Sequence, residues 1–109
     1  MSRISTHVLD TALGAPAAGI AVRLERQSEA CWEMVAVSAT DSDGRCRELA
    51  TDAAAGAYRI TFAAGEYFER GGRRSIYPEI AVTFRCDGTG YYHLPLLLSD
   101  NSYTTYRGS

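Results

Sequence analysis

The sequence has no excess of basic residues and no long apolar run. Eleven basic residues against thirteen acidic ones give a formal net charge of −2, with an isoelectric point near 5.6. This balance argues against nucleic acid as the main partner, because the phosphate backbone attracts chains with a basic surface. No stretch approaches the roughly 20 apolar residues that a membrane-spanning helix needs. We therefore expect a protein that binds neither nucleic acid nor a membrane.

The chain also shows no targeting segment. The N-terminal MSRISTHVLD turns into a patterned segment at once, whereas the apolar centre of a signal peptide alone takes about 7–15 residues. The final RGS differs from the peroxisomal signal SKL. We therefore expect a cytoplasmic location.

Motifs that mark common metal and nucleophile sites are absent as well. The three cysteines form no CxxC pair and there is no HExxH, so neither a disulfide framework nor a zinc site is expected. No GxSxG appears, which argues against a serine nucleophile on a sharp turn. We interpret Cys31, Cys46 and Cys86 as small apolar residues, buried or half-buried.

What the chain does have is an alternation of apolar and polar residues with period two. Its 109 residues suit one domain, spanning residues 1–109, and an apolar fraction of 46% supports a modest core. Turn signals such as DSDGR and CDGTG separate the alternating segments. The pattern predicts an all-β fold, a two-sheet sandwich of seven or eight strands. Only AAGEYFERGG favours a helix, of two turns at most, with Gly71 as its end. The predicted strands are residues 4–9, 20–25, 32–37, 45–49, 58–62, 80–85 and 92–98.

The last predicted strand, YYHLPLLLS, is apolar on both faces. Tyr92 and three leucines would point into the core, but the opposite face carries Tyr91, His93, Pro95 and Leu97. A two-layer sandwich has no further layer to cover that face, so another subunit is the expected cover. The strand thus predicts an oligomer with His93 at or near the subunit contact.

Few residues suggest catalysis. His7 and His93 are the only histidines, and both project away from the predicted core. A histidine on a strand is most often a surface or interface residue; the alternative is an acid–base pair, because histidine exchanges protons near neutral pH. Arg45 follows the Asp43-Gly44 turn, where it is either solvated or holds an anionic group.

Three segments together resemble a known family. STHVLDTALGAPAAGI near the start, TDSDGR in the middle and YYHLPLLLSDNSYTTYRGS at the end are similar to the 5-hydroxyisourate hydrolases, the transthyretin-like enzymes of purine breakdown. The opening motif is shared in broad form with transthyretin, whereas the terminal YRGS is specific to the hydrolase branch. The resemblance covers the whole chain.

The resemblance implies a fold, an assembly and a reaction. The fold would be a transthyretin-like (prealbumin-like) β-sandwich with one short helix. Four subunits would form a homotetramer, a dimer of dimers with sites at the dimer–dimer interface. The reaction would be hydrolytic ring opening of 5-hydroxyisourate to 2-oxo-4-hydroxy-4-carboxy-5-ureidoimidazoline in urate breakdown, with no metal and no organic cofactor.

The resemblance also implies the residues of the site. His7, Arg45 and His93 would be catalytic, the histidines as general acid and base and the arginine as an electrostatic stabiliser. His7 and Arg45 would also bind substrate, together with an ordered C-terminal tetrapeptide. Which histidine is the base stays open, and Arg107 either binds substrate or anchors the tail through an ion pair across the subunit interface. The tetrapeptide residues assigned to substrate binding are Tyr106, Arg107 and Ser109.

Two positions depart from the pattern of the family. Tyr91 stands where the family often has a second histidine, which removes one candidate proton carrier from that strand. Asp100 stands where the family often has proline, and we expect it to alter the loop that aims the terminus.

Two other functions remain open on the sequence. A transthyretin-type carrier of an apolar ligand would share the fold but would not need a polar, reactive channel. A sandwich that binds protein or sugar would account for the tyrosines near the end, Tyr103 and Tyr106, but would leave the terminal tetrapeptide unexplained.

Overall fold

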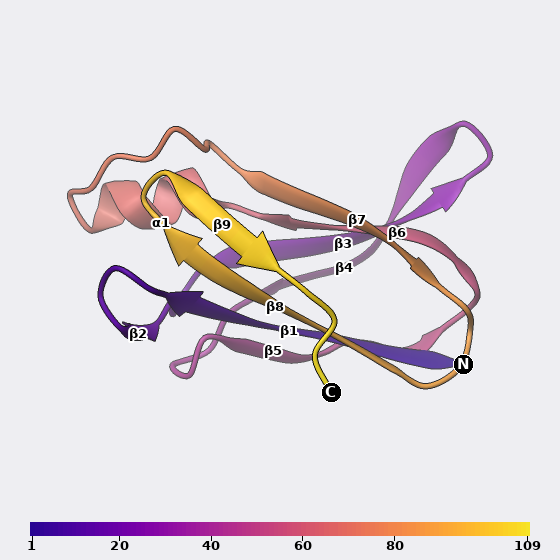
Figure 1. Ribbon diagram of the computed structural model, residues 1–109. Coiled ribbons are helices and arrows are strands. Elements are labelled where there is room, and N and C mark those ends of the chain that lie inside the picture. Colours follow the sequence, from indigo (N-terminus) through magenta and orange to yellow (C-terminus); the bar gives the residue numbers. More distant parts are fainter.

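The alternating segments form two β-sheets that pack face to face, with one short helix at one end (Figure 1). The computed structural model describes residues 1–109. The predicted sandwich with one short helix is confirmed. In chain order the elements are β1 (Ser2–Asp10), β2 (Ala15–Pro16), β3 (Ala21–Ser28), β4 (Cys31–Ala39), β5 (Arg45–Ala53), β6 (Gly56–Phe62), α1 (Ala64–Arg70), β7 (Ile80–Cys86), β8 (Tyr91–Ser99) and β9 (Ser102–Thr105).

The first sheet carries both ends of the chain. Strand β1 lies between β8 on one side and, on the other, β5 and the short β2; β9 follows β8. β1 and β8 run parallel, and their register places Ser5 opposite His93 and His7 opposite Pro95. Ser5 and His93 are therefore direct neighbours in the sheet, although 88 positions separate them in the sequence.

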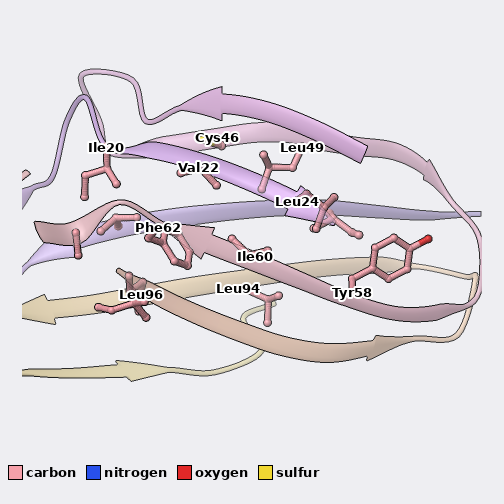
Figure 2. Packing of buried hydrophobic residues seen from close by; sticks show 14 of the residues in the cluster. Ile20, Val22, Leu24, Cys46, Leu49, Tyr58, Ile60, Phe62, Leu94 and Leu96 are labelled. Atoms are coloured by element: carbon pink, nitrogen blue, oxygen red, sulfur yellow. The ribbon is translucent and has the colours of Figure 1, made fainter. Parts of the chain in front are cut away.

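The second sheet is antiparallel and has the order β4-β3-β6-β7. Its inner face meets the inner face of the first sheet, and the apolar core lies between them (Figure 2). As predicted, the leucine side of β8 faces this core, where Leu96 and Leu98 are fully buried. From the second sheet the buried side chains include Val22, Leu24, Tyr58, Ile60, Phe62 and Ile80.

Helix α1 packs against one end of the sandwich. Ala64 and Phe68 are buried one turn apart on its inner side. Glu66 in the first turn and Arg70 in the last turn complement the helix dipole. The helix ends at Gly71, as predicted, and the amide of Gly71 donates to the carbonyl of Phe68. With seven residues this helix is far too short and polar to span a bilayer, and the structure has no other helix.

Three strands differ from the prediction. β2 and β9 were missed because each is too short to display an alternation. β4 was expected to be half-buried, but it is an edge strand and leaves Met34 and Val37 55% and 73% exposed. Its apolar residues are therefore no evidence of a buried face.

The prediction for the cysteines is correct at two positions and wrong at one. Cys46 and Cys86 are buried, whereas Cys31 is exposed. Cys31 begins β4 directly after the tight β3–β4 turn, where Glu29 adopts a positive φ of 53°. A turn at the edge of a sheet leaves its side chains in solvent.

Candidate active site

The outward face of the first sheet gathers the three residues that the sequence suggested for catalysis. Because side chains alternate along a strand, Ser5 and His7 of β1 share this face with Arg45 of β5 and His93 of β8. His7 pairs directly with Arg45, and Ser5 pairs with His93. His7 and His93 are diagonal neighbours on adjacent strands, which places their Cα atoms about 8 Å apart. β1, β5 and β8 thus contribute His7, Arg45 and His93, in that order, to one surface.

The turn before β5 sets the position of Arg45. Oδ1 of Asp41 accepts hydrogen bonds from the backbone amides of Asp43 (2.8 Å) and Arg45 (3.0 Å). The bond from the Arg45 amide is the main reason why the pKa of Asp41 lies below its ordinary value. Gly44 has a φ of +77°, and a Cβ there would lie 2.3 Å from the carbonyl oxygen of Val8. Only glycine allows this turn to approach β1 so closely.

His7 lies half-buried beside the same turn. Its Nε2 donates a hydrogen bond of 2.9 Å to the carbonyl oxygen of Asp43, because a carbonyl oxygen can only accept. The proton of neutral His7 is therefore on Nε2, and Nδ1 is the nitrogen left to exchange a proton.

His93 is held from the side of β1. Its Nδ1 lies 2.7 Å from Oγ of Ser5, and that Oγ lies 2.9 Å from the phenolic oxygen of Tyr91. Nε2 has no hydrogen-bond partner within the chain and is not a buried atom. Burial lowers the pKa of His93, and the positive charges of Arg45 and His7 lower it further. His93 is therefore neutral at neutral pH, with one ring nitrogen engaged and the other free.

A cavity of about 220 Å³ opens on this face. Arg45 and His93 line it together with Ser5 and Tyr91, whereas His7 and the terminal tetrapeptide do not. Three arginines against one glutamate make the lining positive, which suits a ligand with electron-rich oxygens. The remaining lining residues are Arg3, Thr6, Arg47 and Glu48.

The C-terminal tail continues the β9 ladder along β8. Thr105 pairs with Leu96, and three residues further on the amide of Gly108 donates to the carbonyl of His93 at 2.7 Å, in the same register (Figure 1). A Cβ at position 108 would lie 2.9 Å from Cδ2 of His93 and 3.3 Å from Cγ of Pro95. The tail is thus packed directly against the imidazole, and this contact requires glycine.

Alternation along this extension separates the tail residues that were assigned to substrate binding. Tyr106 falls on the site face and is 53% exposed. Arg107 falls on the opposite side: its guanidinium carbon lies 4.0 Å from the centre of the Tyr92 ring, and Nη2 donates to the carbonyl of Tyr91 at 3.0 Å. Ser109 is exposed at the end of the chain. The structure thus brings Tyr106 to the site face and turns the Arg107 side chain away from it.

The tail also covers part of the outward face of β8. Pro95 is buried, and the hydroxyl of Thr105 donates to its carbonyl at 2.8 Å. Leu97 is half-buried, while Tyr91 remains 46% exposed. The chain itself therefore covers some of the apolar surface that the sequence analysis assigned to a second subunit.

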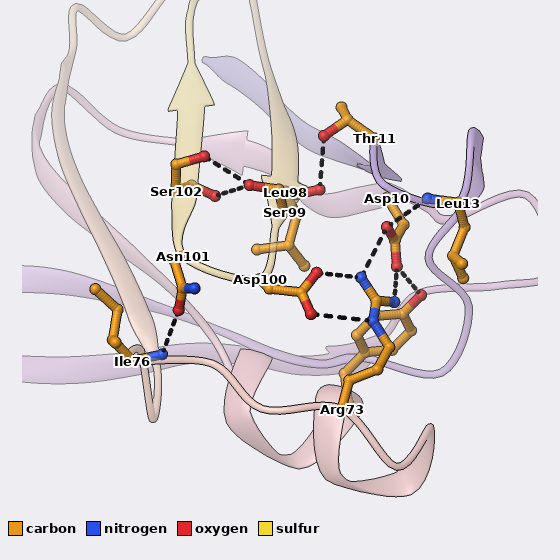
Figure 3. Close-up of polar contacts among 11 residues, drawn as sticks. Asp10, Thr11, Leu13, Arg73, Ile76, Leu98, Ser99, Asp100, Asn101 and Ser102 are labelled. Carbon is orange, nitrogen blue, oxygen red and sulfur yellow. Dashed lines mark hydrogen bonds and ion pairs between the residues drawn. The ribbon is translucent and has the colours of Figure 1, made fainter.

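Asp100, one of the two departures from the family pattern, has a partner within the chain (Figure 3). Arg73, from the loop after α1, donates through Nη2 to Asp100 at 2.6 Å and through Nη1 to Asp10 at the end of β1. Asp10 is fully buried and also accepts a bond of 2.8 Å from the hydroxyl of Tyr67. The ion pairs connect the β8–β9 turn, from which the tail emerges, to β1 and to the helix.

Reasoning from the sequence missed Ser5. It lies two residues before His7 and therefore on the same face of β1, which was the signal available. Its contact with His93 had no local signal, because it depends on the parallel pairing of β1 with β8. No group of three His, Cys, Asp or Glu side chains converges in a way that could hold a metal ion.

Comparisons with known proteins report on the family and the fold of this chain. The family model described as HIUase/Transthyretin family matches residues 4–108. The 5-hydroxyisourate hydrolase of Mus musculus is 44% identical, over 99% of this chain and 96% of that protein. The 5-hydroxyisourate hydrolase of Caulobacter vibrioides is 40% identical over the full length of both.

Solved structures show the same fold in two branches of the family. The 5-hydroxyisourate hydrolase of Klebsiella pneumoniae superimposes with a TM-score of 0.91 at 36% identity, over the full length of both chains. Transthyretin from Sparus aurata superimposes with a TM-score of 0.93 at 31% identity, over 97% of this chain and 96% of that one. The fold does not distinguish an enzyme from transthyretin, but together with the sequence matches it shows that the chain belongs to the HIUase/Transthyretin family.

Proposed function

We propose that the protein is a 5-hydroxyisourate hydrolase, which opens the ring of 5-hydroxyisourate to yield 2-oxo-4-hydroxy-4-carboxy-5-ureidoimidazoline in urate breakdown. Its enzyme class follows from its relatives, which are named 5-hydroxyisourate hydrolases at 40% and 44% identity. The observation that carries the proposal is that His7, Arg45 and His93 share one face of the first sheet. The backbone amide of Gly108 in the tail donates a hydrogen bond to the His93 carbonyl beside them.

Hydrolysis of a cyclic amide makes three demands on a site. The attacking water must lose a proton, the carbonyl oxygen must be stabilised as it gains negative charge, and the leaving ring nitrogen must gain a proton. His93 meets the first demand because it is neutral and its Nε2 is free. His7 faces the same surface with Nδ1 free, and so can bind substrate or supply a proton.

Arg45 and the tail serve the substrate. The Arg45 guanidinium lines the cavity, where it holds electron-rich oxygens and stabilises the developing negative charge. Tyr106 and Ser109 position substrate or water from the tail. Arg107 anchors the tail through the Tyr91 carbonyl and the Tyr92 ring of its own chain, contacts other than the ion pair across the interface that the resemblance implied.

The assembly and the compartment are part of the proposal. Four chains would form a dimer of dimers whose sites lie at the dimer–dimer interface. Such an interface would close the outward face of the first sheet and separate the cavity from bulk solvent. The exposed Tyr91 and the half-buried Leu97 are compatible with this cover. The cytoplasm is the compartment that we propose.

A carrier function is the nearest alternative, since sea bream transthyretin in complex with thyroxine has a TM-score of 0.93 to this chain at 30% identity. The lining of the cavity argues against it. Three arginines, a glutamate and a histidine surround the space, and only one of its eight residues is hydrophobic. An apolar ligand would leave these polar groups without partners, at a cost for each buried group.

A coupled absorbance assay tests the function. Urate oxidase makes 5-hydroxyisourate from urate in the cuvette, and the decay of its ultraviolet band is followed with and without the protein. We expect fast decay with the full-length chain and only background decay with a chain truncated after Thr105, because truncation removes the Gly108 contact with His93. Circular dichroism checks that the truncated chain is folded.

The outcomes separate the candidate functions. No acceleration by folded full-length protein would exclude the hydrolase and favour a carrier. Equal activity of the full-length and truncated chains would leave the enzyme standing but exclude the tail from its site.

A further inference from the structure

The hydroxyls of Ser5 and Tyr91 connect His93 to solvent on the side away from its free nitrogen. Ser5 is 1% exposed and lies between the two rings, 2.7 Å from Nδ1 of His93 and 2.9 Å from the phenolic oxygen of Tyr91. Tyr91 is 46% exposed and forms the solvent-facing end of this hydrogen-bonded network. Tyr91 is also one of the two positions at which the sequence departs from the pattern expected for the family.

Counting protons leaves two arrangements in which the proton of the buried Ser5 hydroxyl has an acceptor. The Ser5 hydroxyl carries one proton and so cannot donate to both neighbours. If Ser5 donates to Tyr91, it must accept from Nδ1–H of His93, and the lone pair of the neutral imidazole is then on Nε2. If Tyr91 donates to Ser5 instead, Ser5 donates to Nδ1, and Nε2 carries the proton. In the imidazolium both ring nitrogens of His93 are protonated, so Nδ1 must donate to Ser5. Only the first arrangement already has this hydrogen bond, so neither hydroxyl has to turn when His93 gains a proton.

We propose that Ser5 and Tyr91 are positioning residues that keep the proton of neutral His93 on Nδ1 and leave Nε2 as the proton acceptor of the ring. The role of Nε2 as a base in catalysis rests on the proposed function, whereas the position of the proton on neutral His93 does not depend on it. Nε2 has no partner within the chain, which is the state that an acceptor for a water proton requires. Gly108 packs against the Cδ2 edge of the ring and limits its rotation.

The proton balance of the reaction follows from this arrangement. The attacking water breaks one O–H bond and passes that proton to Nε2, while its oxygen bonds to the ring carbonyl carbon. The imidazolium keeps its Nδ1–H, which still donates to Ser5, and the proton on Nε2 then passes to the leaving ring nitrogen as the C–N bond breaks. One atom of His93 thus acts as base and then as acid, and the hydroxyl pair does not change its hydrogen bonds.

Neighbouring charges hold the outer end of the network. The Arg3 guanidinium lies over the Tyr91 ring, 5.4 Å from its centre, and pairs at 3.9 Å with Glu48 of β5. The other charged or titratable groups on this face are His7 on β1 and Arg45 and Arg47 on β5, and Arg107 contacts Tyr91 from the tail.

Nitrogen NMR of the full-length protein, labelled with ¹⁵N-histidine, tests the tautomer without substrate. The chain has two histidines, so the His93 signals are readily assigned. At a pH where both are neutral we expect Nδ1–H for His93 in the wild type. Ser5→Ala removes the acceptor, so the proton should move to Nε2. Tyr91→Phe, at an exposed position, frees the serine proton to turn toward Nδ1 and should also populate Nε2–H.

Ser2→Ala is the matched control. It removes another buried hydroxyl from β1, one that donates to the carbonyl of Thr89 at 2.9 Å, far from His93 in the strand. The His93 tautomer should not change. Ser5→Ala should also lower kcat about 10²-fold with little change in KM, since the acceptor is the general base.

The readouts distinguish the two proposals. An Nε2–H tautomer in the wild type, or an unchanged tautomer in folded Ser5→Ala or in Tyr91→Phe, would overturn the positioning role. If the wild type does not accelerate hydrolysis, the proposed function fails, whereas the NMR result still decides the tautomer.

Discussion

Single residues in this protein have roles that depend on one close contact. Gly108 shows this most clearly, because its lack of a side chain lets the tail lie against His93 and Pro95. Gly44 has the same role on the other side of the site, where it lets the turn before Arg45 approach the carbonyl of Val8. Both positions require glycine because a Cβ atom there would be too close to its neighbours.

Gly108→Ala should therefore reduce activity without unfolding the protein. The new methyl group would push the tail away from the imidazole, and a displacement of about 1 Å at a site can cost about 10²-fold in rate. The tail is at the end of the chain, so the melting temperature should change little. Kinetics with 5-hydroxyisourate and thermal unfolding, measured on the same preparation, check both expectations. Wild-type rates in the variant would contradict a role for the tail contact.

The charge of Arg45 should be visible in the titration of His93. Burial and the positive charges of Arg45 and His7 place the pKa of His93 below its ordinary value of about 6.5, so neutral His93 persists to lower pH than in a free peptide. The acid limb of kcat/KM should lie below that pH. Arg45→Gln removes one repelling charge and should raise the His93 pKa, which moves its NMR titration to higher pH.

Arg85→Gln is the control for this titration, since Arg85 is an exposed arginine on the other sheet. It should leave the His93 titration where it is. A fall in the pKa of His93 in Arg45→Gln would contradict the electrostatic account.

Ion pairs hold some secondary-structure elements to one another, and the most buried of these pairs joins Arg73 to Asp10. Arg73 connects the end of β1 at Asp10 with the β8–β9 turn at Asp100 (Figure 3). The two carboxylates differ in environment: Asp10 is fully buried, whereas the Asp100 side chain is 37% exposed. Asp100 thus gives the turn an ion pair at a position where the resemblance led us to expect proline.

The two ion pairs should contribute unequally to stability. Arg73→Met leaves the buried Asp10 carboxylate without its cation and should lower the free energy of unfolding by about 3–5 kcal/mol. Asp100→Asn leaves Arg73 paired with Asp10 and removes a partly solvated charge, so the loss should be about 0–1 kcal/mol. Urea unfolding at neutral pH measures both. Equal losses in the two variants would contradict the difference in burial.

At the scale of the whole molecule we expect four chains to assemble. The cavity is open on the outward face of one sheet, and the proposed interface would close it. We expect analytical ultracentrifugation to give four times the chain mass of 11.8 kDa. If the sites lie between dimers, specific activity should fall when dilution dissociates the tetramer. A fully active monomer would contradict the proposed assembly, although it would leave the chemistry of the site intact.

Local pattern was enough to predict seven of the nine strands, the single helix and the outward direction of both histidines. Alternation reports which side of a strand is buried, and that information lies within a few residues. Residue chemistry singled out His7, Arg45 and His93, and the resemblance added the terminal tetrapeptide. Tertiary structure alone decided which side chains meet: Ser5 with His93, Gly108 with the same imidazole, and Arg73 with Asp10 and Asp100. These contacts join distant segments through strand register, which depends on how the whole core packs.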